Sequence, residues 1–105
     1  MCGIIGIFNN KDSLGLVKRG LIILKERGKD GTNLHNEDNF TLGHTLHSVV
    51  GSVKQPIEGK FVSNCEIYNW EKLNKHKAKN DSELLLRLLE KKGIKALDDL
   101  DGVYS

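Results

Sequence analysis

A cysteine stands at position 2, directly after the initiator methionine. If Met1 is removed, which is expected before so small a residue, the Cys2 thiol lies on the same residue as a free α-amino group. An α-amine titrates at about pH 8, so it can accept the proton that the thiol loses and act as the general base in a nucleophilic attack. A cysteine at this position can also have no role, and the dipeptide alone does not decide between the two.

The residues after Cys2 favour the chemical role. The sequence Gly-Ile-Ile-Gly-Ile-Phe at 3–8 is typical of a buried strand. A terminus that continues directly into a core strand is held in place, whereas most chain termini fray. The strand would therefore position both the thiol and the α-amine.

An amphipathic helix is predicted after this strand, because apolar residues recur there at helical spacing. Asp12 or Ser13 can cap its start, and Gly28 suits its end. Gly15 and Gly20 lower its intrinsic stability by roughly 1 kcal/mol each relative to alanine. We therefore expect the helix to be held by close packing on a sheet.

The rest of the chain is predicted to be β-rich in its middle and helical towards its end. The clearest helix starts at Asn80, since Asn80 and Glu83 have the spacing of a capping box, and Gly93 ends it. This order of elements predicts an α+β or layered α/β domain. The other predicted elements are a polar turn at 27–32, strands at 39–44, 46–51 and 60–64, a short helix at 70–74, a solvated basic loop at 75–79, a second short helix at 94–100 and a strand starting at 103.

Length and composition exclude several classes of protein. The 105 residues are enough for one small domain. Lys and Arg number 16 against 14 Asp and Glu, without the clustered basic surface of a nucleic-acid-binding protein. No apolar run approaches the roughly 20 residues that span a bilayer, and the start lacks the basic region of a secretory signal. We expect a cytoplasmic protein whose partners include neither nucleic acid nor membrane.

Neither the cysteines nor the histidines predict a cofactor. Cys2 and Cys65 are too few for a closed zinc site, and a disulfide between them is the less favoured interpretation in a reducing compartment. The histidines include no helical pair of the kind that binds zinc, and we interpret them as hydrogen-bonding residues of loops and strands. They are His35, His44, His47 and His76.

Five short segments occur in a specific order and spacing. They are Met-Cys-Gly-Ile-Ile-Gly at 1–6, Arg-Gly-Lys-Asp-Gly at 27–31, Leu-Gly-His at 42–44, Asn-Cys-Glu-Ile-Tyr-Asn at 64–69 and Asn-Asp-Ser-Glu at 80–83. Together they resemble the glutamine amidotransferase domain of the N-terminal-nucleophile hydrolases, the class II type that asparagine synthetases carry, and residues 97–102 are similar to it too. The resemblance spans residues 1–105 and implies a partial domain of this type. Its α+β fold has four layers, αββα, with two antiparallel sheets between helical layers, and would be incomplete in this chain.

The resemblance implies hydrolysis of the side-chain amide of glutamine to glutamate and ammonia. Cys2 would attack the amide carbon through its sulfur and form a thioester that water hydrolyses. The oxyanion would be stabilised by the Asn64 side chain and the backbone N–H of Cys65. We expect Arg27 and Asp30 to brace the terminal strand and not to touch the substrate.

The α-ammonium group of the substrate would be bound by Glu66, Asp81 and a backbone carbonyl near Val49, since a carboxylate is the natural partner of a cation. Two of the implied roles have plainer alternatives. Asn64 could be a turn residue at a strand end, and Asp81 could cap the helix that follows.

The sequence departs from the family at two positions. Leu46 stands where the family has an arginine that binds the α-carboxylate of glutamine. Its absence would weaken binding by roughly 10- to 150-fold unless His47, Lys54 or a residue outside the chain substitutes. Cys65 stands where the family has glycine, and a side chain there restricts the dihedral angles that aim the backbone donor. Its thiol could also oxidise with that of Cys2.

Three hypotheses for function remain open. The first is a glutaminase that supplies ammonia to an asparagine synthetase-like domain or subunit. The second is a degenerate binding or regulatory module without catalysis. The third is a structural subunit whose open strand, from Val103 onwards, is completed by another chain or by a second copy.

Overall fold

The residues after Cys2 form strand β1, Gly3–Phe8, as predicted, but the strand is only partly buried, with Gly6 and Phe8 exposed. The computed structural model describes residues 1–48, 51–75 and 77–105. The chain divides into two units. The first comprises Met1–Ser48 and Lys54–Asn64, and the second comprises Val49–Val53 and Cys65–Ser105.

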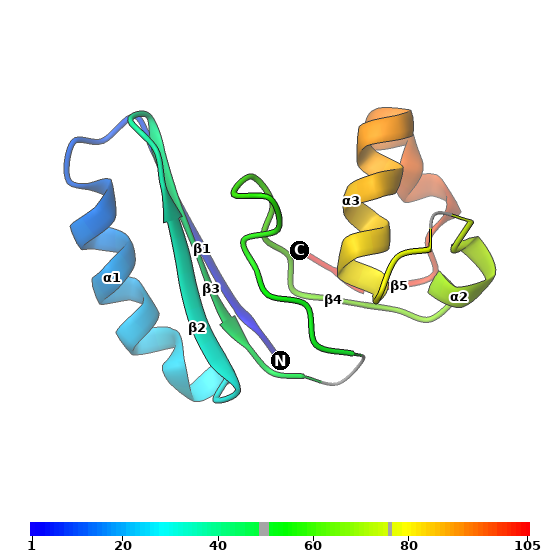
Figure 1. Ribbon diagram of the computed structural model, residues 1–105, viewed down its shortest axis with the longest axis horizontal. Coiled ribbons are helices and arrows are strands. Elements are labelled where there is room, and N and C mark those ends of the chain that lie inside the picture. Colours follow the sequence, from blue (N-terminus) through cyan, green and yellow to red (C-terminus); the bar gives the residue numbers. More distant parts are fainter. Residues whose placement is uncertain (49–50, 76) are drawn as a thin grey trace. The chain divides into compact units, whose positions relative to one another are not determined.

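A three-stranded antiparallel sheet forms the centre of the first unit. Strand β3, Phe40–Leu46, lies between β1 and β2, Gly31–Asn36. Figure 1 shows helix α1, Ser13–Leu24, along one face of this sheet and the irregular segment Lys54–Asn64 on the side of the other face. The sheet is thus covered by different structures on its two faces.

Helix α1 approaches the sheet closely because glycine stands on both sides of the contact. A Cβ atom on Gly43 of β3 would lie 2.8 Å from Val17 Cγ1 and 2.9 Å from Ile5 Cγ2. A Cβ atom on Gly20 of the helix would overlap the side chain of Ile5. The packing predicted for Gly20 is therefore confirmed. The prediction is wrong for Gly15, which has open space around it in the described part of the chain.

The start of α1 is tied to β3 and is not capped by a side chain. Asp12 occupies the N-cap position, but no capping hydrogen bond from its side chain is present among the described residues. Ser13 Oγ instead shares a buried hydrogen bond of 2.8 Å with Thr41 Oγ1. At the other end, the 3₁₀ helix η1, Lys25–Arg27, continues α1 as far as Gly28.

Three predictions for the strands of the chain need correction. The polar turn predicted at 27–32 overlaps β2, which begins at Gly31. The strands predicted at 39–44 and 46–51 are one strand, β3, and residues 49–50 lie outside the described residues. The strand predicted at 60–64 is replaced by an isolated bridge between Ile57 and Phe61. Strand β2 was not predicted because it is a polar edge strand whose residues show no clear apolar alternation.

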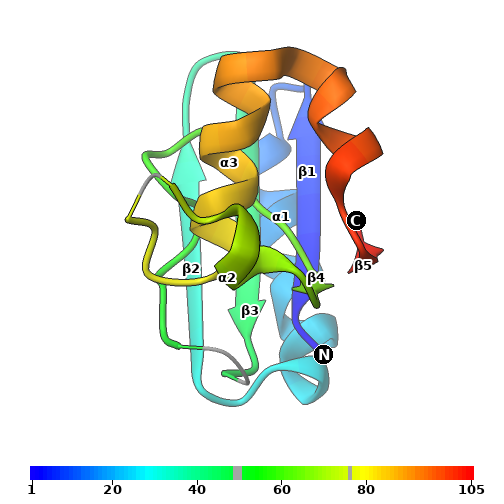
Figure 2. The ribbon, with the colours of Figure 1, turned by 90° about the vertical axis from the view of Figure 1, so that its right-hand side faces the viewer.

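The second unit combines a two-stranded sheet with a helical cluster. Its buried core consists of Ala78, Leu84, Leu88 and Ala96. Figure 2 shows a 3₁₀ helix that leads from the end of α3 towards β5. The short helices predicted near 70–74 and 94–100 are confirmed, the second as a 3₁₀ helix. The elements are β4 (Cys65–Ile67), α2 (Trp70–Leu73), α3 (Asp81–Lys92), η2 (Gly93–Asp99) and β5 (Gly102–Tyr104). Strand β5 pairs antiparallel with β4.

Helix α3 begins with the predicted cap. The Glu83 N–H donates to Asn80 Oδ1 at 2.9 Å. The Glu83 carboxylate accepts from the Lys79 N–H at 2.8 Å, where a capping box would have it accept from Asn80. Gly93 ends the helix with φ of 63°, a conformation that favours glycine.

Each unit combines an antiparallel sheet with helices, so the α+β class is confirmed. The four-layer αββα arrangement stays a prediction. Within the described ranges, no helix has both the length and the apolar character needed to cross a membrane.

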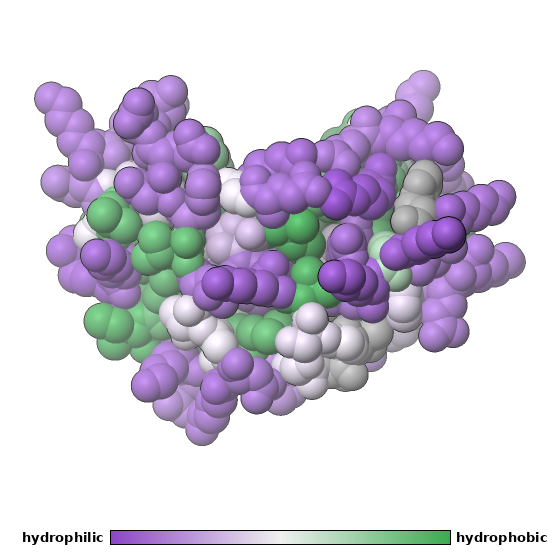
Figure 3. Space-filling view, viewed as in Figure 1, coloured by the Kyte–Doolittle hydropathy of each residue, from purple (hydrophilic) through white to green (hydrophobic). Residues whose placement is uncertain are grey.

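The surface of α1 carries exposed apolar side chains. Ile22 and Ile23 are 74% and 80% exposed, and Figure 3 shows hydrophobic surface over this helix. Folded proteins commonly expose single apolar residues, so these two residues carry no functional argument by themselves.

The contact between α1 and β3 predicts opposite effects for two alanine substitutions. Gly43→Ala should lower the free energy of unfolding by about 1–3 kcal/mol, because the added methyl group overpacks the buried contact with Val17. Gly15→Ala should raise it by about 0.4–1 kcal/mol, since the helix interior there has room and alanine restricts the unfolded chain. Urea denaturation followed by circular dichroism measures both, and equal effects of the two substitutions would contradict the packing described.

Candidate active site

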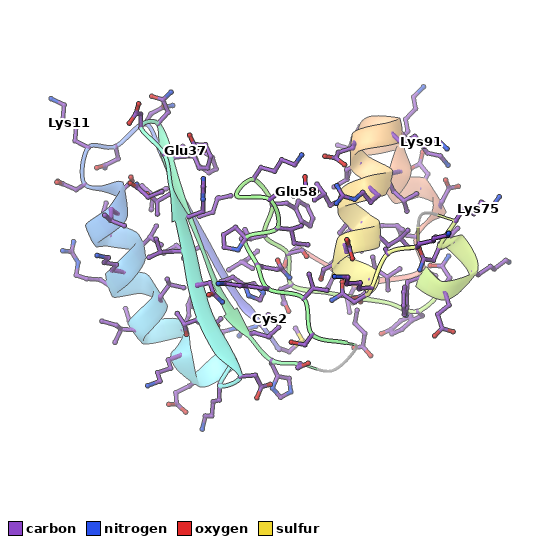
Figure 4. All side chains as sticks on the ribbon, viewed as in Figure 1. Cys2, Lys11, Glu37, Glu58, Lys75 and Lys91 are labelled. Carbon is purple, nitrogen blue, oxygen red and sulfur yellow. The ribbon has the colours of Figure 1, made fainter. Side chains whose placement is uncertain are left out.

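Cys2 lies at the N-terminal start of β1, at the opposite end of the sheet from the turns that carry Lys11 and Glu37 (Figure 4). Its Sγ accepts a hydrogen bond from the His47 N–H at 3.3 Å and lies 3.5 Å from the His47 carbonyl oxygen, to which it can donate. Arg27 Nε donates to the Cys2 carbonyl oxygen at 3.3 Å. Both the thiol and the backbone of Cys2 are thus fixed.

Asp30 holds the chain where it leaves β3. Its Oδ2 accepts from the Ser48 N–H at 2.8 Å, and its N–H donates to the Leu46 carbonyl oxygen at 2.9 Å. The same Oδ2 lies 4.0 Å from Nδ1 of His47. The main chain of His47 in turn contacts the Cys2 thiol, so Asp30 bears on Cys2 only indirectly. The bracing role predicted for Arg27 is confirmed by its bond to Cys2, whereas Asp30 braces the end of β3 and not the terminal strand itself.

A charged cleft of about 460 Å³ adjoins the N-terminus. Arg27 and Lys29 give it positive charge and Glu26 and Asp30 negative charge, with a salt bridge of 3.1 Å between Glu26 and Lys29. Met1 itself is 62% exposed and therefore accessible. The residues that line the cleft are Met1, Glu26, Arg27, Lys29, Asp30 and His47.

Asn64 is the last residue of the first unit and follows an irregular stretch in which Gln55, Ile57 and Ser63 are buried. The Ser63 N–H donates to Gln55 Oε1 at 2.7 Å, and both residues are 2% exposed. No sequence pattern pointed to Gln55, because its partner is eight residues away and neither lies in a helix or strand. Its position directly before the single proline is the only sequence feature that marks it.

His44 is fully buried in the middle strand of the sheet, opposite Ile4 on β1 and Asn33 on β2. Neither ring nitrogen has a hydrogen-bond partner in the described part of the chain. Burial lowers the pKa of His44 from 6.5, and the nearby main chain of Ser63 opposes the shift less strongly. The hydrogen-bonding role predicted for the histidines is therefore wrong for His44.

The second unit contains the three remaining candidates for the site that the structure describes. Asp81 is 4% exposed, and its two carboxylate oxygens accept from the Ile67 N–H at 3.1 Å and the Ser82 N–H at 2.9 Å. Cys65 Sγ lies 3.2 Å from Ser82 Oγ. Glu66 is exposed on β4.

These contacts decide one of the open alternatives. Asn80 caps α3, so Asp81 is not its cap and instead fastens β4 to the start of the helix. In the structure described, no disulfide joins Cys2 and Cys65.

The predicted site is divided between the two units. Cys2 and Asn64 belong to the first, and Cys65, Glu66 and Asp81 belong to the second. Val49, near which a carbonyl was predicted to bind the substrate, lies outside the described residues, as does His76. No group of three or more His, Cys, Asp or Glu side chains within residues 1–48, 51–75 and 77–105 could hold a metal ion.

The structure is that of an α+β protein in which a cysteine is fixed at the start of the first strand. Residues 1–105 match the glutamine amidotransferase domain family. The chain therefore belongs to this family.

Curated relatives agree over the full length of the chain. It is 31% identical to asparagine synthetase B (glutamine-hydrolyzing) of Escherichia coli K12 over 123 residues, and 35% identical to asparagine synthetase (glutamine-hydrolyzing) 1 of Arabidopsis thaliana over 124 residues. It is 31% identical to the human asparagine synthetase (glutamine-hydrolyzing) over 122 residues. Each comparison covers 100% of this chain but only 22%, 21% and 22% of the relative. The chain thus spans about a fifth of the length of these relatives.

The buried imidazole of His44 predicts a loss of stability in acid. Below pH 6.5 the unfolded chain binds a proton at His44 that the folded chain resists, because the folded pKa is lower. The free energy of unfolding should therefore fall as the pH drops from 6.5 towards the folded pKa, by at most about 1.4 kcal/mol per pH unit. Urea denaturation at pH 7.5, 6.5 and 5.5 measures this slope.

Two variants isolate the contribution of His44. His44→Gln should flatten the slope, since it removes the titrating group. His35→Gln, on the partly exposed edge strand β2, should retain it. Identical slopes for the wild type and His44→Gln would show that another group causes the pH dependence.

Proposed function

We propose that this chain carries the glutaminase chemistry of its family, with Cys2 as the nucleophile. The observation that supports this most directly is the fixation of Cys2, whose thiol contacts the His47 main chain and whose carbonyl binds Arg27. A nucleophile on a chain terminus needs such fixation, because catalysis requires a defined attack geometry. The accessible Met1 at the rim of the cleft is consistent with its removal by an aminopeptidase.

The proposed reaction proceeds in two steps. With Met1 removed, the α-amine of Cys2 accepts the thiol proton while the sulfur attacks the amide carbon of glutamine. The C–S bond forms, the C–N bond breaks, and the proton passes to the leaving nitrogen, which departs as ammonia. A water molecule then attacks the thioester, giving glutamate and returning a proton to the sulfur. The Asn64 side chain and the Cys65 backbone N–H are the proposed donors to the oxyanion in both steps.

Glu66 and Asp81 are the proposed carboxylates for the α-ammonium group, together with a backbone carbonyl near Val49. The two backbone hydrogen bonds that Asp81 accepts hold its carboxylate in a defined position. Carboxylate oxygens have further lone pairs available for an ammonium group. This part of the proposal requires the two units to assemble as in the four-layer αββα fold, for which residues 1–105 would supply a partial domain.

Leu46 bears on how tightly glutamine would bind. It ends β3 and offers no charge to the α-carboxylate of the substrate. His47, whose side chain lines the cleft near Asp30, and Lys54 are the proposed substitutes within the chain. The loss of the family's arginine also favours the second hypothesis, a binding module that does not turn over its ligand.

The proposed destination of the ammonia is a synthetase domain or subunit. This rests on the names of the relatives, which are glutamine-hydrolyzing asparagine synthetases. A homo-oligomer or a complementing chain is an alternative partner. The cytoplasmic location stays a prediction from sequence.

The test measures ammonia release from glutamine by the chain, and by the complete polypeptide that its gene encodes, after removal of Met1. Turnover should be lost in Cys2→Ser and retained in Cys65→Ser, because the Cys65 contribution is a backbone donor. Protein that retains Met1 should be inactive, since its Cys2 has no α-amine. Mass spectrometry identifies the N-terminus of each preparation.

A glutamine-analogue electrophile separates catalysis from binding. Labelling of Cys2 that glutamine suppresses supports the proposal. If the complete polypeptide neither releases ammonia nor labels at Cys2, the glutaminase function is wrong. Glutamine binding by calorimetry without either signal would establish the non-catalytic module instead.

A further inference from the structure

The segment Lys54–Asn64 is fixed by local backbone and side-chain contacts and not by a strand ladder. An isolated bridge joins Ile57 and Phe61, with backbone hydrogen bonds of 2.8 and 3.2 Å between them. Gly59 lies so close to the His35 ring that an added Cβ atom would be 2.8 Å from it. The path between these residues is therefore defined by local contacts within the first unit.

The buried side chain of Gln55 joins the start of this segment to its end. Its Oε1 accepts the Ser63 N–H at 2.7 Å, a short distance for a bond between neutral groups. Burial of an amide side chain is unfavourable unless it is hydrogen-bonded, and Gln55 is 2% exposed. The bond to the Ser63 N–H therefore offsets the cost of burying the Gln55 amide, and it gives the side chain a defined position.

Ser63 transmits that position to Asn64. The Ser63 N–H lies one residue before Asn64, so only the backbone dihedral angles of these two residues separate the fixed amide from the Asn64 side chain. Asn64 is the proposed side-chain donor to the oxyanion. A donor of this kind stabilises the transition state only if it is already aimed when the charge develops.

We propose that Gln55 is a positioning residue for glutamine hydrolysis, which aims Asn64 by holding the Ser63 N–H. This inference rests on the proposed glutaminase function. Gln55 does not touch the substrate. Its effect is on the preorganisation of the oxyanion donor and should therefore appear in kcat much more than in KM.

Gln55→Met tests the inference, because methionine has a similar volume and no acceptor for the Ser63 N–H. We expect kcat, expressed per Cys2 titrated by the electrophile, to fall about 10- to 100-fold, with KM for glutamine changed less than about threefold. Gln55→Glu retains an Oε acceptor and should recover most of the lost kcat. Gln55→Asn serves as a second variant if Gln55→Met folds poorly. Its side chain is one methylene too short to reach the Ser63 N–H, so we expect a smaller fall in kcat of the same kind.

A double-mutant cycle with Asn64→Ala separates positioning from general stability. If Gln55 acts through Asn64, Gln55→Met should have almost no further effect on kcat in the Asn64→Ala background. Multiplicative effects of the two substitutions would overturn the inference. If the wild type is active and Gln55→Met has the same kcat, the inference is also wrong, but the proposed glutaminase function stands.

Hydrogen exchange gives a readout that does not depend on activity. The Ser63 amide should be protected in the wild type and in Gln55→Glu, and should exchange at least tenfold faster in Gln55→Met. Amides of β3 should remain protected in all three proteins and so report that the sheet is intact. Equal protection of the Ser63 amide in the wild type and Gln55→Met would overturn the inference even if no turnover is found.

Discussion

Strand β1 pairs with β3 along its whole length, from Gly3 opposite Thr45 to Phe8 opposite Phe40. The buried hydroxyl of Thr45 strengthens this pairing at the end where Cys2 lies. It accepts from the Gly3 N–H at 3.0 Å and donates to the Leu24 carbonyl oxygen at 3.2 Å. One side chain therefore connects the first strand, the middle strand and the C-terminal end of α1. Buried polar groups that are fully hydrogen-bonded in this way specify a single arrangement of the backbone.

The contacts of Cys2 continue that pairing beyond the last ladder residue. The His47 main chain binds the thiol, and Arg27, in the 3₁₀ helix after α1, binds the carbonyl oxygen. Both partners lie in segments that follow directly from the elements tied by Thr45. The position of Cys2 thus depends on the packing of α1 against the sheet, and that packing depends in turn on the absence of a side chain at Gly43.

The sequence predicts those parts of the fold in which local pattern and tertiary role agree. The apolar run of β1, the periodic leucines of α3 and the cap at Asn80 are local signals, and the structure contains all three. Strand β2 carries polar residues on a sheet edge, so its pairing with β3 is decided by the tertiary structure and not by its own pattern.

The same distinction applies to the residues of the site. Cys2 is recognisable from its position, and Asn64, Glu66 and Asp81 from their motifs. The role proposed for Gln55 follows from its bond to Ser63, which no sequence pattern indicates. The burial of His44 without a hydrogen-bond partner could not be predicted from the sequence either, because β3 mixes polar and apolar residues.

The first and second units meet the demands of the proposed chemistry by different means. Cys2, the proposed nucleophile, directly precedes the β1–β3 ladder, which suits a chain terminus because each ladder bond reduces fraying. Asn64 follows an irregular segment that has no ladder, and the fixation proposed for it comes from a buried side-chain acceptor. Asp81 stands in the first turn of α3, where its carboxylate accepts hydrogen bonds from two backbone N–H groups. Cys2 and Asn64 share the first unit, so contacts within that unit can hold both of them, whereas the proposed backbone donor of Cys65 and the proposed ammonium-binding carboxylates belong to the second unit.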